Sequence, residues 1–329
     1  MTSTASLSLS EAEALFGSML DGGMADEAIA AELVAMADRG ETAAEVAGAV
    51  RAMRARMKPV AAPENAIDVC GTGGDGQHSL NVSTAVALVV AACGVPVAKH
   101  GNRAASSKAG GADTLEKLGL DLAGAGAKAE ATLGDMHIAF LFAQAHHPAL
   151  ARMAPIRKSL GRRTIFNLTG PLANPARVTR QLAGVASPEL VPLIADAMRM
   201  LAIERAMIVS GMEGLDEISI AGPSRVEAIG FDFPKEIVPE DAGLPRHSLE
   251  AIRGGDPEHN ANALRALLRG EDLGDNGAYR DAVVLNAAAA LVVAGEAATL
   301  REGAEEAREA IDKGLAKALL DCWIDTVKS

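Results

Sequence analysis

The chain has 329 residues, enough for one large domain or two smaller ones. Hydrophobic residues make up 49% of it and charged residues 22%, which is typical of a globular protein and excludes a disordered chain. With 31 basic and 43 acidic residues the formal net charge is −12, which disfavours binding to bulk nucleic acid or to anionic membranes. Aromatic residues make up only 2%, too few to predict stacking platforms for single-stranded nucleic acid.

The cysteines and the apolar stretches indicate the compartment. Cys70, Cys93 and Cys322 lie far apart with no C-x-x-C spacing, so neither a disulfide framework nor a zinc site is expected. The first ten residues lack the charged and apolar regions of a secretory signal. The longest near-apolar stretch, residues 85–98, is too short to span a bilayer. We therefore expect a soluble, cytoplasmic protein with no membrane or nucleic-acid partner.

Three amphipathic helices are predicted in the first 57 residues. Ser10 and Glu13 have the spacing of a capping box and predict the start of the first helix. A second helix ends near Gly40, and Thr42 with Glu45 predicts the start of the third. Three short helices cannot bury all their apolar faces by themselves, so they must pack on the rest of the chain or on a second copy.

Strands and helices are predicted to alternate after a proline-containing linker at residues 58–63. The expected strands are 66–70, 95–99, 138–142, 181–185 and 205–210, and the expected helices are 83–92, 113–118, 188–201 and the region from residue 282 onward. This alternation predicts an α/β fold whose sheet has a strong parallel component.

A glycine-rich loop, Gly71-Thr72-Gly73-Gly74-Asp75-Gly76, follows the first predicted strand. Glycines allow the backbone to approach a ligand closely and to present N–H groups to an anion. The loop also fits G-x-G-x-x-G, but no helix is predicted directly after it. The second strand ends in Lys99-His100 rather than in an acidic residue, which disfavours a dinucleotide site. A plain tight turn stays open for the loop taken alone.

Two further polar segments follow. Asn81, Ser83 and Thr84 stand at a predicted helix start, where short polar side chains either cap the helix or bind a phosphate. The segment from Lys99 to Ser107 places two cations, an imidazole, an amide and two hydroxyls directly after a strand. Two such segments at successive strand ends predict a crevice for a polyphosphorylated ligand.

These segments together resemble the anthranilate phosphoribosyltransferase family. The likeness also rests on Arg163-Thr164-Ile165-Phe166-Asn167, Gly170-Pro171-Leu172-x-Asn174-Pro175 and Gly214-Leu215-Asp216-Glu217-Ile218, and it extends to Ile311-Asp312-x-Gly314. The resemblance implies transfer of the phosphoribosyl group from 5-phosphoribosyl 1-diphosphate (PRPP) to the amine of anthranilate. The products are N-(5-phosphoribosyl)anthranilate and diphosphate, in L-tryptophan biosynthesis. Such an enzyme positions its substrates and stabilises charge, so no catalytic nucleophile is implied.

The resemblance also implies the architecture: a small all-helical domain plus a larger α/β domain with a mainly parallel central sheet flanked by helices. The site would lie in the cleft between the two domains, with a hinge that closes on substrate. We place the helical domain at residues 1–64, joined by about 148–175, and the α/β PRPP-binding domain at residues 65–329. The family is typically dimeric through its helices, so a homodimer is expected.

The site residues implied by the resemblance fall into three groups. PRPP would be bound by Gly71, Gly74, Asp75, Ser79, Asn81, Val82, Ser83, Thr84, Lys99, His100, Gly101, Asn102, Arg103, Ala104, Ala105, Ser106, Ser107 and Gly111. Anthranilate would contact Gly71, His100, Asn102, His147, Arg157 and Pro171, with the guanidinium suited to its carboxylate. Mg²⁺, as two ions, would be held by Ser83, Asp216 and Glu217.

Two positions depart from the family pattern, and two other functions stay open. Leu80 stands where the family usually has a phenylalanine, and Gly111 stands where a serine is common.

A pyrimidine nucleoside phosphorylase shares the fold type, but it needs its own lysine–serine phosphate motif in place of residues 99–102. A non-catalytic nucleic-acid-binding relative needs a basic face, which the net charge of −12 opposes.

Overall fold

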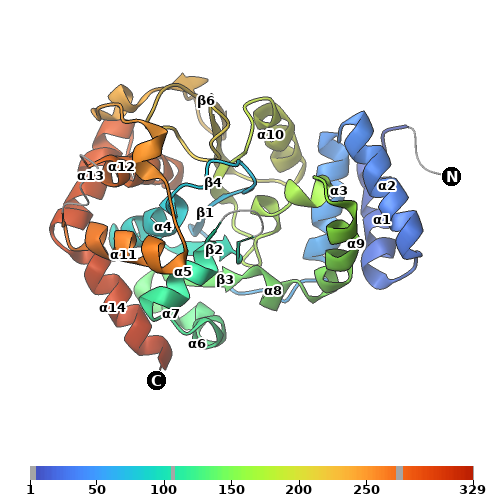
Figure 1. Ribbon diagram of the computed structural model, residues 1–329, viewed down its shortest axis with the longest axis horizontal. Helices are drawn as coiled ribbons and strands as arrows, with labels where there is room; N and C mark the ends of the chain where they lie inside the picture. The colour runs from blue at the N-terminus through green and yellow to red at the C-terminus, as the bar shows by residue number, and fades with distance from the viewer. Residues whose placement is uncertain (1–4, 105–107, 272–276, 329) are drawn as a thin grey trace.

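The computed structural model describes residues 5–104, 108–271 and 277–328. Its centre is a seven-stranded sheet in the order β3-β2-β1-β4-β5-β6-β7 (Figure 1). The strands are Ile67–Gly71 (β1), Val97–Gly101 (β2), Ile138–Phe142 (β3), Arg180–Gly184 (β4), Arg205–Gly211 (β5), Ser224–Ile229 (β6) and Glu236–Ile237 (β7). Neighbours from β3 to β5 are parallel, whereas β6 and β7 pair antiparallel at one edge. The predicted α/β fold with a mainly parallel sheet is confirmed.

The strand predictions hold for the parallel part of the sheet and miss the antiparallel edge. The strand at 138–142 matches, and the other four parallel strands lie within two residues of their predicted bounds. β6 alternates buried Val226 with exposed Arg225 and half-buried Glu227. Such a mixed strand, next to the edge strand β7, lacks the continuous apolar run that marks a strand buried on both faces.

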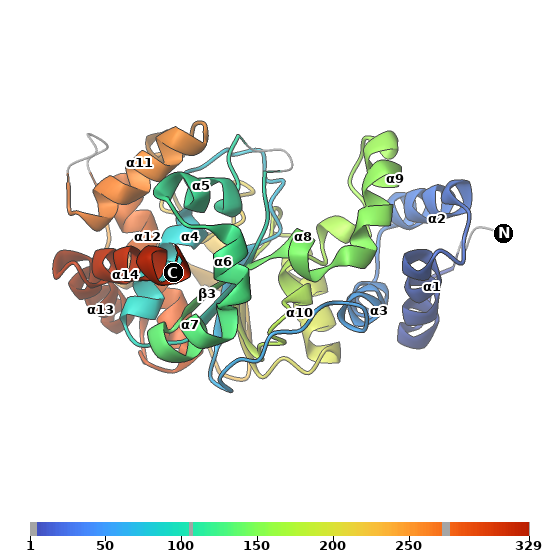
Figure 2. The same ribbon diagram turned by 90° about the horizontal axis from the view of Figure 1, so that it is seen from below.

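Helices cover both faces of the sheet (Figures 1 and 2). One face carries Val82–Ala92 (α4), Ala278–Ala294 (α12), Leu300–Asp312 (α13) and Leu315–Lys328 (α14), and the opposite face of β4 and β5 carries Leu190–Met200 (α10). Successive strand side chains point to opposite faces, so Leu182 joins the first core and Ala183 the second. Helix α12 is buried along nearly its whole length, which explains its Ala- and Val-rich sequence without a polar face.

Five further helices belong to the α/β part of the chain. They are Gly111–Leu118 (α5), Leu122–Ala127 (α6), Ala129–Met136 (α7), Ala143–His146 (α8) and Pro257–Leu268 (α11). Short 3₁₀ turns are Pro148–Arg152 (η1), Ile165–Asn167 (η2), Pro171–Ala173 (η3), Pro239–Ala242 (η4) and Leu249–Ile252 (η5). In the described part of the chain, no helix is both long and apolar enough to cross a membrane.

Four helices form a separate group at one end of the molecule (Figures 1 and 2). They are Leu9–Asp21 (α1), Asp26–Arg39 (α2), Ala43–Arg54 (α3) and Met153–Leu160 (α9). The Phe16 ring meets the Phe166 ring edge-on, with 5.7 Å between the ring centroids. The three N-terminal helices therefore pack on a later segment of the same chain, and their core continues to the sheet face beneath α10.

The helix starts in this group follow local capping. Thr42 and Glu45 form the predicted reciprocal capping box of α3. The prediction of a Ser10–Glu13 box for α1 is wrong, because the box is formed by Ser8 and Glu11. Both pairs have the same S-x-x-E spacing, so the spacing alone could not decide between them.

Candidate active site at the carboxyl ends of the strands

The site lies where the order of the strands reverses. β1 and β4 are neighbours, but the chain runs from β1 to β2 on one side and from β4 to β5 on the other. In open α/β sheets the crevice at the carboxyl ends of such a strand pair is where ligands bind. Here the two strands end in Gly71 and Gly184, which are paired in register. The loop after β5, which carries Asp216 and Glu217, crosses directly above them.

The close approach of this loop requires both glycines. A Cβ atom at Gly71 would lie 2.8 Å from Asp216 Cγ, and one at Gly184 would overlap the main-chain oxygen of Asp216. The Gly73 N–H donates to Asp216 Oδ2 at 2.7 Å, so the glycine loop holds the carboxylate from the other side. Gly73 itself has a φ of 67°, in the left-handed region that favours glycine. Gly184 was not predicted from the sequence, because a single strand-end glycine carries no local signal.

Carboxylates crowd at this point. Burial and the neighbouring Asp75 raise the pKa of Asp216, and burial and the neighbouring Asp216 raise the pKa of Glu217. The Ser83 N–H donates to Glu217 Oε1 at 3.2 Å, which links the start of α4 to the acidic loop. Lys99 Nζ, from β2, donates to Ser83 Oγ at 3.2 Å and to the Val69 carbonyl at 2.8 Å. The predicted metal ligands Ser83, Asp216 and Glu217 are thus close together.

This donor set fits Mg²⁺. The crowded carboxylates repel one another, and a divalent cation would relieve that repulsion. Among the described residues, no three His, Cys, Asp or Glu side chains converge as a complete metal cage. Mg²⁺ does not need one, because it keeps several waters and takes phosphate oxygens from a substrate.

The helix start at Asn81 has a role other than capping. The Asn81 side chain makes no capping hydrogen bond to α4. Instead its Oδ1 accepts from Thr114 Oγ1 at 2.6 Å and from Asn260 Nδ2 at 2.8 Å, and its Nδ2 donates to the Ala109 carbonyl at 3.3 Å. These bonds tie the segments around residues 81, 109 and 260 together. Asn260 was not predicted, since α11 lies far along the chain.

The two departures from the family pattern have structural explanations. Leu80 is buried and belongs to the main core, and its N–H donates to the Ile252 carbonyl. A Cβ at Gly111 would lie 3.0 Å from Thr84 Oγ1, so glycine lets the start of α5 approach α4. The backbone of Ser79, next to Leu80, forms an isolated antiparallel β-bridge with that of Arg253.

The segment after β2 is tied to α5. Arg103 pairs with Asp113 at 2.8 Å and with Glu116 at 2.9 Å, and the Ala104 N–H donates to Asp113 at 3.0 Å. Asn102 Oδ1 accepts from the Arg103 N–H and, at 3.4 Å, from Gln144.

Three other predicted PRPP contacts carry no polar side chain. The backbone of Gly101 packs against the Phe140 ring, Val82 begins α4 as a core residue, and Gly74 adopts a φ of 77°. The predicted residues Ala105, Ser106 and Ser107 lie outside the described residues.

Two buried histidines lie side by side behind this segment. The His100 and His147 ring centroids are 5.3 Å apart. His100 Nδ1 donates to the Gly170 carbonyl at 3.0 Å, which leaves its Nε2 as an acceptor. The Nε2 atoms of both rings are buried and have no hydrogen-bond partner among the described residues. Burial lowers the pKa of His100 to about 3 and that of His147 to about 4, so both rings are neutral at neutral pH.

Arg157 projects from α9 without an acidic partner. Its Nη2 donates to Asn167 Oδ1 at 3.4 Å, and its guanidinium carbon lies 5.7 Å from the Phe166 ring centroid. It forms no ion pair within the described residues, and its partial burial lowers the pKa of the guanidinium. The segment from Asn167 to Gly170 connects Arg157 to His100. A carboxylate ligand would therefore complete both the charge and the bidentate geometry of Arg157.

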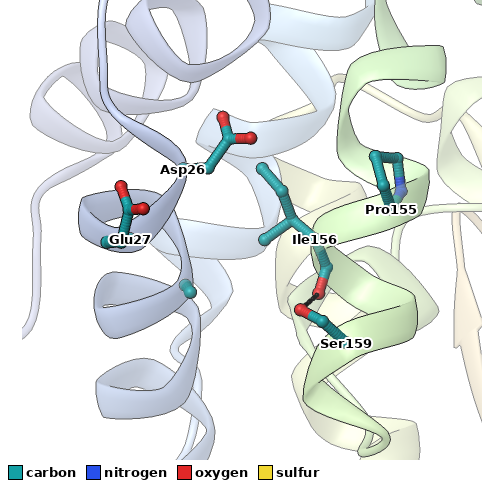
Figure 3. Close-up of a pocket in the computed structure, with 6 residues that line it drawn as sticks. Asp26, Glu27, Pro155, Ile156 and Ser159 are labelled. Carbon is teal, nitrogen blue, oxygen red and sulfur yellow. Dashed lines mark hydrogen bonds between the residues drawn. The ribbon is translucent and has the colours of Figure 1, made fainter.

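A hollow of about 270 Å³ between α2 and α9 lies apart from this crevice (Figure 3). It is lined by Asp26, Glu27, Ala30, Pro155, Ile156 and Ser159. Two of these side chains are carboxylates, and Asp26 is paired with Arg152 at 3.0 Å. Such a lining does not suit an anionic ligand.

Comparison with known proteins agrees with the geometry of the crevice. The model of the glycosyl transferase family, a/b domain, matches residues 63–317, and that of the same family's helical bundle domain matches residues 2–57. A relative from Novosphingobium aromaticivorans, named anthranilate phosphoribosyltransferase, is 64% identical over 95% of this chain and 94% of its own length. The chain belongs to the anthranilate phosphoribosyltransferase family. A second relative with this name, from Sphingopyxis alaskensis, is 62% identical over 95% of the chain and 94% of its own length.

Solved structures of the family have the same fold. Anthranilate phosphoribosyltransferase from Thermus thermophilus superposes with a TM-score of 0.94 at 42% identity, covering 99% of this chain and 97% of its own. The Saccharomyces cerevisiae family member, solved in complex with PRPP and Mg, has a TM-score of 0.88 at 31% identity, covering 97% and 92%. The family resemblance and the enzyme class expected from the sequence are confirmed.

Replacing Gly184 with alanine tests the close approach of the acidic loop. The new methyl group overlaps the main chain of Asp216, so the loop must move by about an ångström or more. A displacement of that size in a positioned group lowers turnover by about 100-fold. The measurement is the steady-state transferase rate, with circular dichroism to confirm folding. Gly222→Ala, where nothing lies within 4 Å of the added Cβ, is the matched control, and equal rates for the two variants would contradict the account.

Proposed function

We propose that this crevice binds PRPP at the carboxyl ends of β1 and β2 and binds anthranilate beside the segment 165–173. The chain, as a member of its family, transfers the phosphoribosyl group from PRPP to the amine of anthranilate and releases diphosphate. One observation carries the assignment of the site. The acidic pair Asp216 and Glu217 lies on the glycines of two neighbouring strands, beside the Gly73 N–H and Lys99.

The PRPP side is assigned to the loops after β1 and β2. The proposed contacts are Gly71, Gly74, Asp75, Ser79, Asn81, Val82, Ser83, Thr84, Lys99, His100, Gly101, Asn102, Arg103, Ala104 and Gly111, with Ala105, Ser106 and Ser107 from outside the described residues. Backbone N–H groups of the glycine loop and the start of α4 suit phosphate oxygens. Arg103 would exchange one of its exposed ion pairs with Asp113 and Glu116 for phosphate, which is a small loss because exposed pairs are weak.

Ser83, Asp216 and Glu217 would hold Mg²⁺, and we propose two ions. The S. cerevisiae family member solved with PRPP and Mg supports the cofactor. Bound between carboxylates and diphosphate, Mg²⁺ neutralises charge that builds on the leaving group. Lys99 adds a fixed positive charge from β2, and its hydrogen bond to Ser83 orients that hydroxyl.

The acceptor side is assigned to Gly71, His100, Asn102, His147, Arg157 and Pro171. Arg157 would take the anthranilate carboxylate, which supplies the missing counter-charge. The buried Nε2 atoms of His100 and His147 have no hydrogen-bond partner among the described residues, and they would accept hydrogen bonds from the anthranilate substrate. Because both rings are neutral, they add no positive charge where positive charge develops on the ribose. A S. cerevisiae family member solved with 4-fluoroanthranilate supports an aromatic acid as acceptor.

The reaction then needs positioning more than chemical participation by the protein. The ribose C1–O bond to diphosphate breaks as the C1–N bond to the amine forms, and the amine loses one proton, which the released diphosphate or water takes up. The glycine loop and Lys99 hold the leaving group, while Arg157 holds the acceptor at its far end. Fixing both partners converts a bimolecular step into an effectively unimolecular one. No side chain acts as a nucleophile in this scheme.

We also propose two domains: residues 1–64 joined by about 148–175 form the helical domain, and the rest of residues 65–329 forms the α/β domain. The two domains would move about a hinge that closes the cleft between them. The shared packing of α1–α3 with α9 supports the first unit. The three cysteines are free, as expected in a reducing cytoplasm, where we place the enzyme.

Removing either acidic side chain's charge tests the metal assignment. Asp216→Asn and Glu217→Gln each lose a Mg²⁺ ligand and should lower turnover by roughly 100-fold or more. Chelation of the wild-type enzyme should abolish turnover, and added Mg²⁺ should restore it. Asp196→Asn, which removes an exposed partner of Arg199, is the control and should keep full activity. Full activity in excess chelator would reject the assignment.

Arg157→Ala tests the acceptor assignment. Loss of a charge-assisted hydrogen-bonding partner, roughly 1.5–3 kcal/mol, should weaken anthranilate use by about 10- to 150-fold. The KM for PRPP should change little, because its proposed contacts lie mostly in the loops after β1 and β2 and not on α9. Arg157→Lys should rescue only in part, since a point charge lacks the planar fork. Steady-state kinetics with each substrate varied gives the answer, and equal effects on both substrates would show that the arginine is structural.

We propose that two copies of the chain form a homodimer through their N-terminal helices. The amphipathic helices α1–α3 offer apolar surface at one end of the molecule, and Leu7, Leu9 and Leu15 are only partly buried there. Multi-angle light scattering across a wide concentration range should give twice the 33.7 kDa chain mass. A constant monomer mass would contradict the proposal.

A further inference from the structure

The segment 170–174, which joins the acceptor side to the sheet, is held by side chains from several elements. η3 is a single 3₁₀ turn in which the Ala173 N–H donates to the Gly170 carbonyl at 3.3 Å. The last carbonyls of a helical turn otherwise lack main-chain donors within it. Three consecutive carbonyls in this segment each accept from a different side chain: Gly170 from His100 Nδ1 at 3.0 Å, Pro171 from Gln181 Nε2 at 2.6 Å, and Leu172 from Arg54. Asn174 Nδ2 adds a bond to the Ala98 carbonyl at 2.7 Å.

Most of these donors belong to the sheet, but Arg54 does not. His100 lies on β2 and Gln181 on β4, whereas Arg54 is the last residue of α3 in the helical group. Arg54 Nε and Nη2 both donate to the Leu172 carbonyl, at 3.0 and 2.7 Å. Of the three side chains that donate hydrogen bonds to these carbonyls, Arg54 is the one that comes from the helical group.

The use of Arg54 is unusual for a largely enclosed cation. A desolvated guanidinium ordinarily pairs with a carboxylate. Among the described residues Arg54 has no ion-pair partner, and both of its hydrogen bonds go to one neutral carbonyl. Burial and the nearby Arg177 lower its pKa to about 10, so it remains charged at neutral pH. The contact is therefore a charge-assisted hydrogen bond, which is stronger than a neutral one.

We propose that Arg54 is a positioning residue for the acceptor pocket, acting through the Leu172 carbonyl on Pro171 and on the Gly170–His100 bond. The inference rests on the proposed function, in which Pro171 and His100 contact anthranilate. Loss of the Arg54 contact removes the hydrogen bonds from the helical group and leaves only the apolar packing of Leu172 and Ala173 on that side. Pro171 and the His100 ring then lose their fixed placement relative to Arg157, which lies in the helical group.

The experiment separates KM for anthranilate from KM for PRPP in two variants. Arg54→Met keeps the apolar stem without the donors and should raise the KM for anthranilate about tenfold. The KM for PRPP should stay within about twofold, because His100 is the one proposed PRPP contact with a hydrogen bond to the segment 170–174 among the described residues, and most of the other contacts lie in the loops after β1 and β2. Arg54→Lys keeps the charge with one donor group in place of the fork, so it should fold and show an intermediate KM for anthranilate.

Arg56→Met is the matched control. Arg56 follows the same helix end, and its Nε donates to Asp21 at 2.6 Å rather than to the segment 170–174. It should leave both KM values unchanged. Melting temperatures of all three variants show how much each substitution destabilises the fold.

A rise in the KM for anthranilate alone, partly rescued in Arg54→Lys, supports the proposal. Equal changes in both KM values, or a lower melting temperature with both KM values unchanged, would show a merely structural arginine and overturn it. Failure of the proposed function is distinguishable, because the wild-type enzyme would then not consume anthranilate at all.

Discussion

The site depends on one steric constraint, the contact between Asp216 and the two strand-end glycines. Gly71 and Gly184 leave room for the loop after β5 to lie directly on the ends of β1 and β4. That contact places Asp216 within reach of the Gly73 N–H and puts Glu217 beside Ser83. Burial raises the pKa of both carboxyl groups, and repulsion from Asp75 adds to the rise at Asp216 and repulsion from Asp216 to that at Glu217, which makes the position favourable for a divalent cation.

The proposed acceptor side is built on a different principle. It combines Arg157, a cation without an acidic partner, with the neutral imidazoles of His100 and His147. The Nε2 atoms of these two rings have no hydrogen-bond partner among the described residues. The segment 170–174 joins it to the sheet through carbonyls held by His100, Gln181 and Arg54. The proposed PRPP site, with its carboxylates and Lys99, can therefore lie next to a proposed acceptor site whose charged group is Arg157 and whose two imidazoles are neutral.

Local patterns in the sequence were sufficient for the parallel strands, for the helical start and for the loops at the strand ends. They predicted Thr42 and Glu45 as a capping box, and they placed Ser83, Lys99 and Asp216 in one crevice through motif resemblance. They failed where the signal is degenerate, as with Ser10–Glu13 against Ser8–Glu11. They also failed where the function of a residue arises from long-range packing. Gly184, Asn260 and Arg54 act on loops far from them in sequence, and no short window contains both partners.

The most direct test of the account is to follow anthranilate fluorescence after mixing the wild-type protein with anthranilate, PRPP and Mg²⁺. We expect a steady loss of fluorescence as the amine is substituted. The loss should require all three components and should stop when chelator is added. Unchanged fluorescence with folded protein, or the same rate without PRPP or in excess chelator, would contradict the assignment of this crevice as a metal-dependent phosphoribosyl transfer site.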